Sequence, residues 1–201
     1  LVERARDAGA MAYLVKPFQK RDLVPMIEVA LARHSELTAL ERSVGDLESR
    51  LVARKVVAVI PVSAHAQRIA LSVDDRCAFT ADQTQPQLAV IDTATNEVKT
   101  WIPLSTVAYG TAPTPDGKWL LVALPAAGQV AVVDLASMKV ARTIDVPKTP
   151  QEILVRPDGK VAYVSCDQSG QVAAIELATW KVEKLIAAGP MADGLAWARL
   201  D

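Results

Sequence analysis

Three aspartates recur at one spacing in the second half of the chain. Asp74, Asp116 and Asp158 lie 42 positions apart, and the last two stand in the same string, Pro-Asp-Gly-Lys. Carboxylates act as general acid and base when two of them share one cleft. Proline, aspartate and glycine in succession are instead typical of a β-turn, because proline presets φ and glycine accepts a positive φ. We therefore interpret these residues as structural turns and not as a catalytic set. The turn residues are Asp116, Gly117, Asp158 and Gly159.

The other side chains of reactive type stand alone in the sequence. His34 and His65 have no acid or cysteine at the spacing of metal ligands. Cys166 ends a predicted strand without an identifiable histidine partner, so we expect a buried free thiol. Ser63 lacks the glycine elbow of a hydrolase nucleophile. The sequence therefore indicates no catalytic residue, no metal site and no cofactor.

Composition narrows the class of protein. The chain has 201 residues, of which 51% are hydrophobic and 22% charged, with a formal net charge of −1. So apolar a chain is not a disordered tail, and its balanced charge argues against nucleic acid as a partner. Two cysteines do not make a disulfide framework, and no apolar run reaches the roughly 18 residues that span a bilayer. A globular chain without membrane spans is expected.

The composition changes near residue 57. Residues 1–57 hold ten Lys or Arg and eight Asp or Glu, whereas residues 58–201, more than twice as long, hold twelve and fifteen. Helix formers dominate the first part, and Val, Ile, Thr and glycine turns dominate the second. Such a step usually marks a domain boundary. We expect one domain at 1–57 and another at 58–201.

The first part has the pattern of a strand, a break and a long helix. A short apolar run at 11–15 has the length of a strand and is broken by Lys16-Pro17-Phe18. Asp22 is a candidate N-cap, and Pro25 would lie in the first turn. Apolar residues then step by three and four, the seam pattern of a coiled coil. They are Leu37, Leu40, Val44, Leu47 and Leu51. The predicted fold class is therefore α+β, with a long helix that could pair with another.

The second part repeats every 42 residues. The string Ala-Val-Ile-Asp at 89–92 recurs in related form at 131–134 and 173–176, and a valine recurs at 98, 140 and 182. Within one period, turns separate four predicted strands, at 153–155, 161–165, 171–177 and 181–186. A period of about 42 residues with strand-like segments is typical of β-propeller blades. The tryptophans occupy different phases of this period, which favours packing over an aromatic cage. They are Trp101, Trp119, Trp180 and Trp197.

Two strings carry a resemblance to a known family. Val90 to Val98, Val-Ile-Asp-Thr-Ala-Thr-Asn-Glu-Val, and Pro157 to Ser165, Pro-Asp-Gly-Lys-Val-Ala-Tyr-Val-Ser, resemble the YVTN family of β-propeller repeats over about residues 66–198. The resemblance implies about three blades of an incomplete propeller. Propellers usually close with about 4–8 blades, so the open ends would expose apolar faces and a sheet edge.

The first part resembles a different family. The string Ala8 to Phe18, Ala-Gly-Ala-Met-Ala-Tyr-Leu-Val-Lys-Pro-Phe, is similar to the end of a response-regulator receiver domain, and the segment ending 48–57 to the linker of ANTAR-type regulators. The resemblance implies that Lys16 and Pro17 reach a phosphorylation pocket and that Tyr13 reports phosphorylation. The acidic pair and the phospho-acceptor of that family would lie upstream of Leu1. RNA binding does not carry over, because strand-like sequence begins at about Ala58.

Three functions remain open at this point. The first is a non-catalytic binding or scaffold protein, in which blades are fused to a truncated receiver. The second is a response regulator of a phosphorelay, whose full-length form uses the propeller as output. The third, an enzyme of quinoprotein or lactonase type, would need polar residues that converge on the propeller axis.

We expect a protein partner, or self-association through residues 23–51 and the open edges, without nucleic acid or membrane. Receivers are cytoplasmic whereas YVTN propellers are often exported; the expectation here is cytoplasmic. A fragment of a longer protein, or a junction created near residue 57 by gene assembly, would also explain the sequence.

Overall fold

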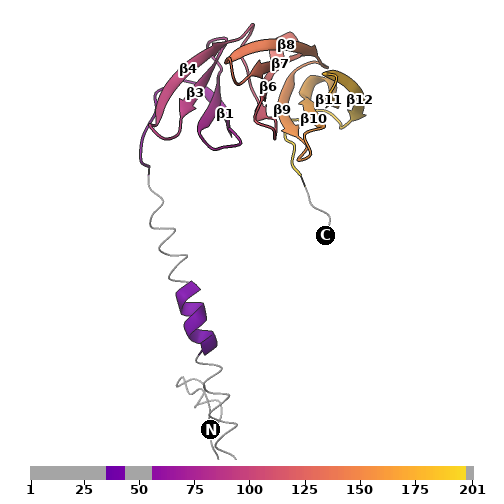
Figure 1. Cartoon of the computed structure of the whole chain (residues 1–201). Helices are drawn as coiled ribbons and strands as arrows, with labels where there is room; N and C mark the ends of the chain where they lie inside the picture. Colours follow the sequence, from indigo (N-terminus) through magenta and orange to yellow (C-terminus); the bar gives the residue numbers. More distant parts are fainter. Residues whose placement is uncertain (1–34, 44–55, 198–201) are drawn as a thin grey trace, which may run out of the picture. The chain divides into compact units, whose positions relative to one another are not determined.

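The computed structural model describes residues 35–43 and 56–197. The chain divides into two compact units, Leu1–Val57 and Ala58–Asp201 (Figure 1). The predicted strand at 11–15 and the receiver-like residues Lys16, Pro17 and Tyr13 lie outside the described residues. The fold can therefore be followed mainly in the second unit.

The expectation of an α+β chain with a long helix is wrong, because the described part of the chain is mostly β. Among the described residues, α-helix is confined to 35–43. Leu37 and Leu40, the seam residues within it, are 46% and 64% exposed. A short helix whose apolar side chains face water gains no stability from packing. A coiled coil is therefore not supported; Val44, Leu47 and Leu51 lie outside the described residues.

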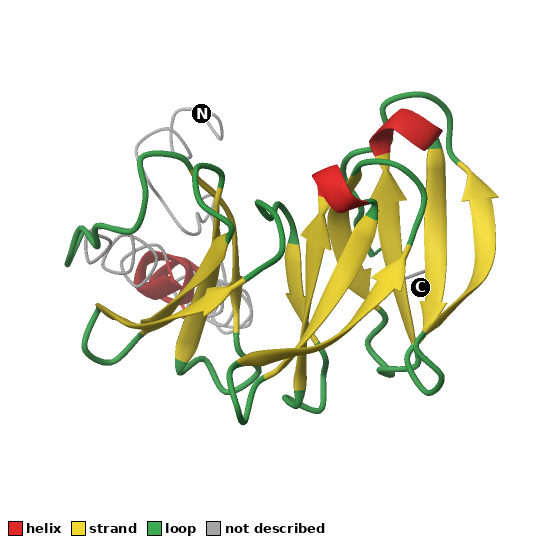
Figure 2. Ribbon diagram, turned by 90° about the horizontal axis from the view of Figure 1, so that it is seen from above, coloured by secondary structure: helices red, strands yellow, loops and turns green. Residues whose placement is uncertain are grey.

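The second unit consists of three antiparallel sheets of four strands each (Figure 2). Sheet 1 contains β1 (Ala66–Leu71), β2 (Cys77–Asp82), β3 (Gln87–Asp92) and β4 (Glu97–Pro103). Sheet 2 contains β5 (Thr111–Pro113), β6 (Trp119–Leu124), β7 (Gln129–Asp134) and β8 (Lys139–Asp145). Sheet 3 contains β9 (Pro150–Val155), β10 (Val161–Cys166), β11 (Gln171–Glu176) and β12 (Lys181–Ala187). Short 3₁₀ helices, η1 (Pro125–Ala127) and η2 (Asp167–Ser169), join the middle strands of sheets 2 and 3.

Strand order follows sequence order in every sheet, so each is a simple meander. In the described residues no sheet closes into a barrel, since each keeps two free edges. The structure supports three antiparallel sheets in place of an α+β chain that ends in an incomplete propeller. The physical reason is that strand and turn patterns extend over most of the chain, whereas the helix-forming composition is limited to its first part.

The sheets repeat in detail. Their second strands begin at Cys77, Trp119 and Val161, each 42 positions after the one before. The pairing of the third with the fourth strand shifts register at one equivalent step in all three sheets. These steps are Val90/Ile91, Val132/Val133 and Ala174/Ile175. A bulge increases the local twist of a strand. Equal lengths and equal bulges therefore give three sheets of the same shape.

The turns between first and second strands explain the recurring aspartates. Asp116 Oδ1 accepts a hydrogen bond from the backbone N–H of Lys118 at 3.1 Å, and Asp158 Oδ1 accepts one from Lys160 at 3.0 Å. Gly117 has φ 69° and Gly159 has φ 68°, in the left-handed region that favours glycine. The carboxylate and the glycine together hold each turn in one shape.

Two apolar cores fill the spaces between the sheets. The first core lies between sheets 1 and 2 and includes Phe79, Leu88 and Ile102 from sheet 1 with Leu120 and Val122 from sheet 2. The second core lies between sheets 2 and 3. It includes Leu121, Val130, Val132, Ile144, Ile153, Val164 and Ile175. Because successive side chains of a strand point to opposite faces, β6 and β7 supply both cores. Burying one such side chain stabilises the fold by about 1.5–3 kcal/mol.

Candidate functional site

A cavity of about 710 Å³ opens between the turn ends of sheets 2 and 3. Its lining combines two tryptophans, three carboxylates, one lysine and backbone of two Pro-Asp-Gly turns. The lining residues are Thr114, Pro115, Asp116, Trp119, Asp158, Gly159, Lys160, Glu176, Leu177, Ala178 and Trp180. The turn residues Asp116, Asp158 and Gly159 therefore face this cavity as well as shaping their own turns. We call it the turn cavity.

Two tryptophans that are distant in sequence meet at the wall of the turn cavity. Trp119 begins β6, and Trp180 ends the turn before β12. Their ring centroids are 5.5 Å apart at 73°, an edge-to-face contact. The guanidinium carbon of Arg142 lies 5.8 Å from the Trp119 centroid and 5.3 Å from the Trp180 centroid. A cation is thus already held by this aromatic pair.

Packing of these rings was expected from the sequence, but their meeting was not. Trp180 stands one period after Met138, which packs against the first core as Trp180 packs against the second. Both residues have positive φ, 54° and 59°. Trp119 stands one period after Cys77, a member of the first core. Aligning the repeats by their 42-residue period therefore indicates that both tryptophans occupy positions that pack against a core. Comparing the tryptophans only with one another does not indicate this.

Each carboxylate of the turn cavity accepts a side-chain hydrogen bond, and in two of them this bond lowers the pKa. Thr114 Oγ1 donates to Asp116 Oδ1 at 2.6 Å, and this bond is the main reason that the pKa of Asp116 is lowered. The Arg156 side chain donates to Asp158 at 2.8 Å and lowers the pKa of that carboxyl in the same way. Thr179 Oγ1 donates to Glu176 at 2.7 Å. The lining residues include three carboxylates and one lysine, and Asp158 and Asp116 are also paired with Arg156 at 2.7 Å and with Lys118 at 3.9 Å.

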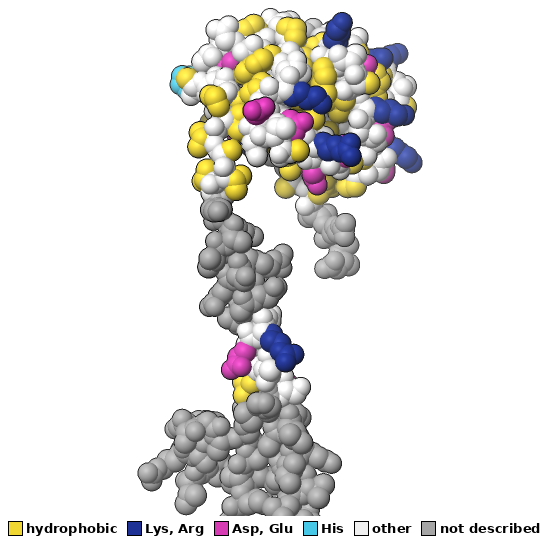
Figure 3. Space-filling model, turned by 60° about the vertical axis from the view of Figure 1, so that its left-hand side comes forward, with side chains coloured by type: hydrophobic (Ala, Val, Ile, Leu, Met, Phe, Trp, Pro, Cys, Tyr) yellow, Lys and Arg dark blue, Asp and Glu magenta, His cyan; other side chains and the backbone are white. Residues whose placement is uncertain are grey.

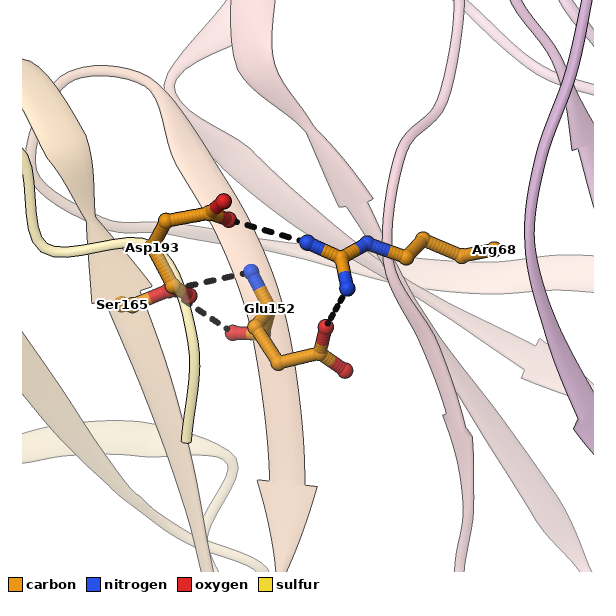
Figure 4. A network of polar contacts seen from close by, with 4 residues as sticks. All are labelled: Arg68, Glu152, Ser165 and Asp193. Carbon is orange, nitrogen blue, oxygen red and sulfur yellow. Dashed lines mark hydrogen bonds and ion pairs between the residues drawn. The ribbon is translucent and has the colours of Figure 1, made fainter. Parts of the chain in front are cut away.

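A second polar cluster joins the first strands of sheets 1 and 3. Arg68 Nη1 lies 3.2 Å from Glu152 Oε2, and Arg68 Nη2 donates to Asp193 Oδ1 at 3.1 Å (Figure 4). Ser165 Oγ accepts from the backbone N–H of Glu152 at 3.0 Å and donates to the carbonyl of Asp193. The ring of Tyr109 lies 5.2 Å from the guanidinium carbon. This inner cluster thus ties sheet 1, sheet 3 and the segment after β12 together.

Local backbone geometry aims Arg68 across the sheets. The register of β1 with β2 shifts between Gln67 and Ile69, and Arg68 itself has φ 52°. A bulge of this kind redirects one side chain out of the regular alternation. Burial works to lower the pKa of Arg68, but Glu152, Tyr109 and Asp193 outweigh it and raise that pKa. The guanidinium is therefore a permanent positive charge between two carboxylates.

A third pairing, between Ser63 and Asp82, was missed from the sequence. Ser63 Oγ donates to Asp82 Oδ1 at 2.6 Å, and Thr84 donates to the same oxygen through its hydroxyl and its backbone N–H. Burial alone would raise the pKa of Asp82, but these bonds and one from Gln87 lower it far below its ordinary value. The carboxylate anchors the chain before β1 to the end of β2.

The cysteines are free and buried. Burial raises the pKa of the Cys166 thiol to about 11, so it is not a poised nucleophile. Among the described residues, no group of three or more His, Cys, Asp or Glu is arranged to hold a metal ion. No helix in the same residues is long and apolar enough to cross a membrane. His34 lies outside the described residues.

Surface charge is mixed on the face drawn in Figure 3. Lys and Arg side chains gather toward one side of the three-sheet unit, with Asp and Glu side chains among them and apolar patches between. Residues 58–201 hold twelve Lys or Arg and fifteen Asp or Glu, so the two signs are nearly balanced in this unit. Long-range attraction to one sign of partner is therefore weak on this face, and local pockets must supply selectivity.

Comparison with known proteins connects part of the chain to a regulator. A segment of 57 residues is 65% identical to the transcriptional regulatory protein PdtaR of Mycobacterium tuberculosis, in two strains. The match covers 28% of this chain and 28% of that protein. Its length equals that of the unit Leu1–Val57. The chain therefore contains a regulator-like segment but spans little more than a quarter of the relative that it matches.

Solved structures share the fold of the three-sheet unit. Hydrazine synthase of Kuenenia stuttgartiensis aligns with a TM-score of 0.62 and 23% identity, over 69% of this chain and 40% of that one. A functionally unknown protein from Desulfotomaculum acetoxidans aligns with a TM-score of 0.61 and 19% identity, over 68% of this chain and 47% of that one. At these identities the likeness shows the fold alone. No protein-family model matches the chain.

Proposed function

We propose that the three-sheet unit is a non-catalytic binding module attached to a regulator-like segment. The observation that carries the proposal is the turn cavity, because it combines an aromatic wall with ionised carboxylates at the ends of rigid turns. Concave sites with a few placed polar groups are the usual binding sites of proteins. The turns are fixed by Asp116 and Asp158, so the cavity is formed before a ligand arrives.

The chemistry of the lining favours an extended peptide with a basic side chain. Asp116, Asp158 and Glu176 outnumber Lys160, and all three carboxylates line one cavity. The Trp119–Trp180 pair already accepts the guanidinium of Arg142, which demonstrates that the rings suit a planar cation. An arginine of a partner protein would meet the same rings from the cavity side and the carboxylates at its rim.

Binding of a labelled arginine-alanine peptide to the full chain tests this function. Trp180→Gly should weaken binding about tenfold, since it removes the ring while glycine suits the positive φ at this position. Trp101→Ala, in β4 and outside the cavity, is the matched control and should leave the affinity unchanged. A glutamate-alanine peptide should not bind. Equal affinity of both peptides, or equal loss in both variants, would refute the proposal.

A second candidate function is signal output in a response regulator of the phosphorelay type. The 57-residue match to a transcriptional regulatory protein favours it. In this function the regulator-like segment receives a signal and the three-sheet unit passes it to a protein partner in the cytoplasm. The affinity of the peptide for the full chain and for residues 58–201 would then differ. Equal affinities, measured on a fragment that still unfolds cooperatively, would leave the simple binding module as the function.

A further inference from the structure

Alignment of the three sheets by their 42-residue period shows that sheet 3 has an uncovered face. At three equivalent positions the side chains of sheets 1 and 2 are almost fully buried, whereas those of sheet 3 are partly open. Phe79 and Leu121 are 1% and 0% exposed, and Leu88 and Val130 are both 0% exposed. Their equivalents in sheet 3, Tyr163 and Val172, are only half-buried.

The third position gives the clearest contrast. Ile102, near the end of β4, is 0% exposed, and Ile144, near the end of β8, is 6% exposed. Ile186, their equivalent in β12, is 38% exposed. Ile102 and Ile144 are covered because each belongs to a core that the following sheet completes. Ile186 has no following sheet among the described residues.

A segment without regular secondary structure nevertheless stands where the first strand of a following sheet would lie. Residues 191–197 stand one period after 149–155, and Met191 repeats the positive φ of Thr149, 61° against 58°. The backbone carbonyl of Asp193, on the yellow segment in Figure 4, accepts a hydrogen bond from Ser165 Oγ. Trp197 packs edge-to-face on Tyr163 at 6.0 Å and donates from Nε1 to the carbonyl of Val155 at 3.3 Å. This segment therefore lies where the first strand of a fourth sheet would begin.

The interior of the molecule indicates what should cover the rest of the face. Sheets 1 and 2 are covered mainly by the middle strands of the next sheet, β6–β7 and β10–β11. The covering side chains are small or branched and apolar. They are Leu120, Val122, Ala131 and Val133 in sheet 2, and Ala162, Val164, Ala173 and Ile175 in sheet 3. In sheet 2, β6 also pairs with the short first strand β5 at Thr111, Ala112 and Pro113.

We propose that the open face of sheet 3, together with residues 191–197, binds an antiparallel β-hairpin from another polypeptide. The first strand of the hairpin pairs with the backbone of Leu195, Ala196 and Trp197, the equivalents of the β5 residues that pair with β6. Its alternate side chains are uncharged and of alanine to leucine size, and they cover Val172 and Ile186. Backbone pairing supplies affinity, and the apolar face supplies selectivity. This surface is separate from the turn cavity, so it does not depend on the function proposed above.

A peptide with the sequence of residues 117–136, which contains β6 and β7, is the direct probe. We expect saturable binding of the labelled peptide to the full chain, with slower amide exchange at residues 193–197. The same peptide with Val122→Asp should not bind, because an unpaired charge would be buried. A second probe is the peptide of residues 161–176, from β10 and β11. Failure of both peptides to bind, or protection confined to other segments, would overturn the proposal.

Two variants of the chain localise the binding. Ile186→Glu should weaken the peptide complex about tenfold or more, since it puts a carboxylate under the hairpin. Leu185→Glu is the matched control, because Leu185 directly precedes Ile186 in β12, is 48% exposed and points to the opposite face. Its affinity should equal that of the unsubstituted chain. Equal weakening by both glutamates would show that the hairpin binds elsewhere and would contradict the inference.

Discussion

Arg68 Nη1 lies 3.2 Å from Glu152 Oε2, although the residues stand 84 positions apart on the first strands of sheets 1 and 3. Two full repeats separate them, and β5 of the sheet between contacts both of their strands. The pair depends on the curvature of the whole stack and not on neighbouring strands. Any change that opens the stack should break it before it disturbs the apolar cores.

Arg68→Met removes both ion pairs of this residue while it keeps a long side chain. We expect the free energy of unfolding to fall by about 0.5–1 kcal/mol, because exposed and half-exposed pairs contribute modestly. The melting temperature should fall by about 2–4 °C in a thermal scan. Salt at about 1 M should reduce the difference, since it screens the charges.

Arg76→Met is the control for this variant. Arg76 is 85% exposed and contacts Asp74 at 3.8 Å within its own turn. Its loss should leave the melting temperature unchanged. An equal shift in both variants would mean that the pair between sheets adds nothing beyond an ordinary surface charge.

Gly159→Val should destabilise the turn before β10. Gly159 has φ 68°, and a Cβ there would meet the Pro115 ring at an ordinary 3.7 Å, so the cost comes from backbone strain. A β-branched residue at such a φ costs about 1–2 kcal/mol. Thermal unfolding measures this loss of stability.

The opposite substitution is available in the first repeat, where Asp75 occupies the equivalent position with φ 58°. Asp75→Gly should therefore raise the melting temperature, and a fall there would argue against strain.

Asp82 should make stability depend on acid pH. Its pKa is lowered in the folded chain by bonds from Ser63 and Thr84, against about 3.9 when unfolded. The stabilisation is therefore complete above about pH 5, begins to fall near the unfolded pKa and is lost as pH falls through the lower folded pKa. Asp82→Asn should be less stable near pH 7 and should flatten the curve of unfolding free energy below about pH 4. Asp145→Asn, at an exposed carboxylate, is the control. Parallel curves for Asp82→Asn and the unsubstituted chain would contradict the expectation.

Cys166 should resist alkylation while the chain is folded. Its side chain is 0% exposed and burial raises the pKa of the thiol to about 11, so little thiolate is present near neutral pH. Iodoacetamide at pH 8 should label it only after denaturant is added, with mass spectrometry as the readout. Labelling of the native chain at the rate of a free thiol would show that sheet 3 opens readily.

The strands were accessible to sequence reasoning because each carries local signals. Alternation of apolar residues and the turn residues Asp116, Gly117, Asp158 and Gly159 recur with one period, and strands of equal length begin at that period. The predicted fold class is wrong because the helical spacing of Leu37 and Leu40 does not show whether these side chains have another surface to pack against. Both are exposed.

The side-chain contacts of the candidate site join residues that are distant in sequence, and no local sequence pattern predicts them. Arg68 meets Glu152 and Asp193 because a bulge turns its side chain across the stack. Trp119 meets Trp180 because adjacent sheets bring the start of one strand beside the turn of the next. Such meetings depend on how sheets pack, and only a residue-by-residue alignment of the repeats could have indicated them.

The middle sheet has a consequence for how the molecule comes apart. Leu120 and Val122 of β6 face one core and Leu121 faces the other, so loss of this strand removes both at once. Fraying should begin at the terminal sheets, each of which gives up a single core, and proceed inward. Native-state hydrogen exchange should accordingly rank β6 and β7 as the last amides to open. A truncation within β6 or β7 should therefore leave no stably folded fragment, and proteases should degrade the remaining chain.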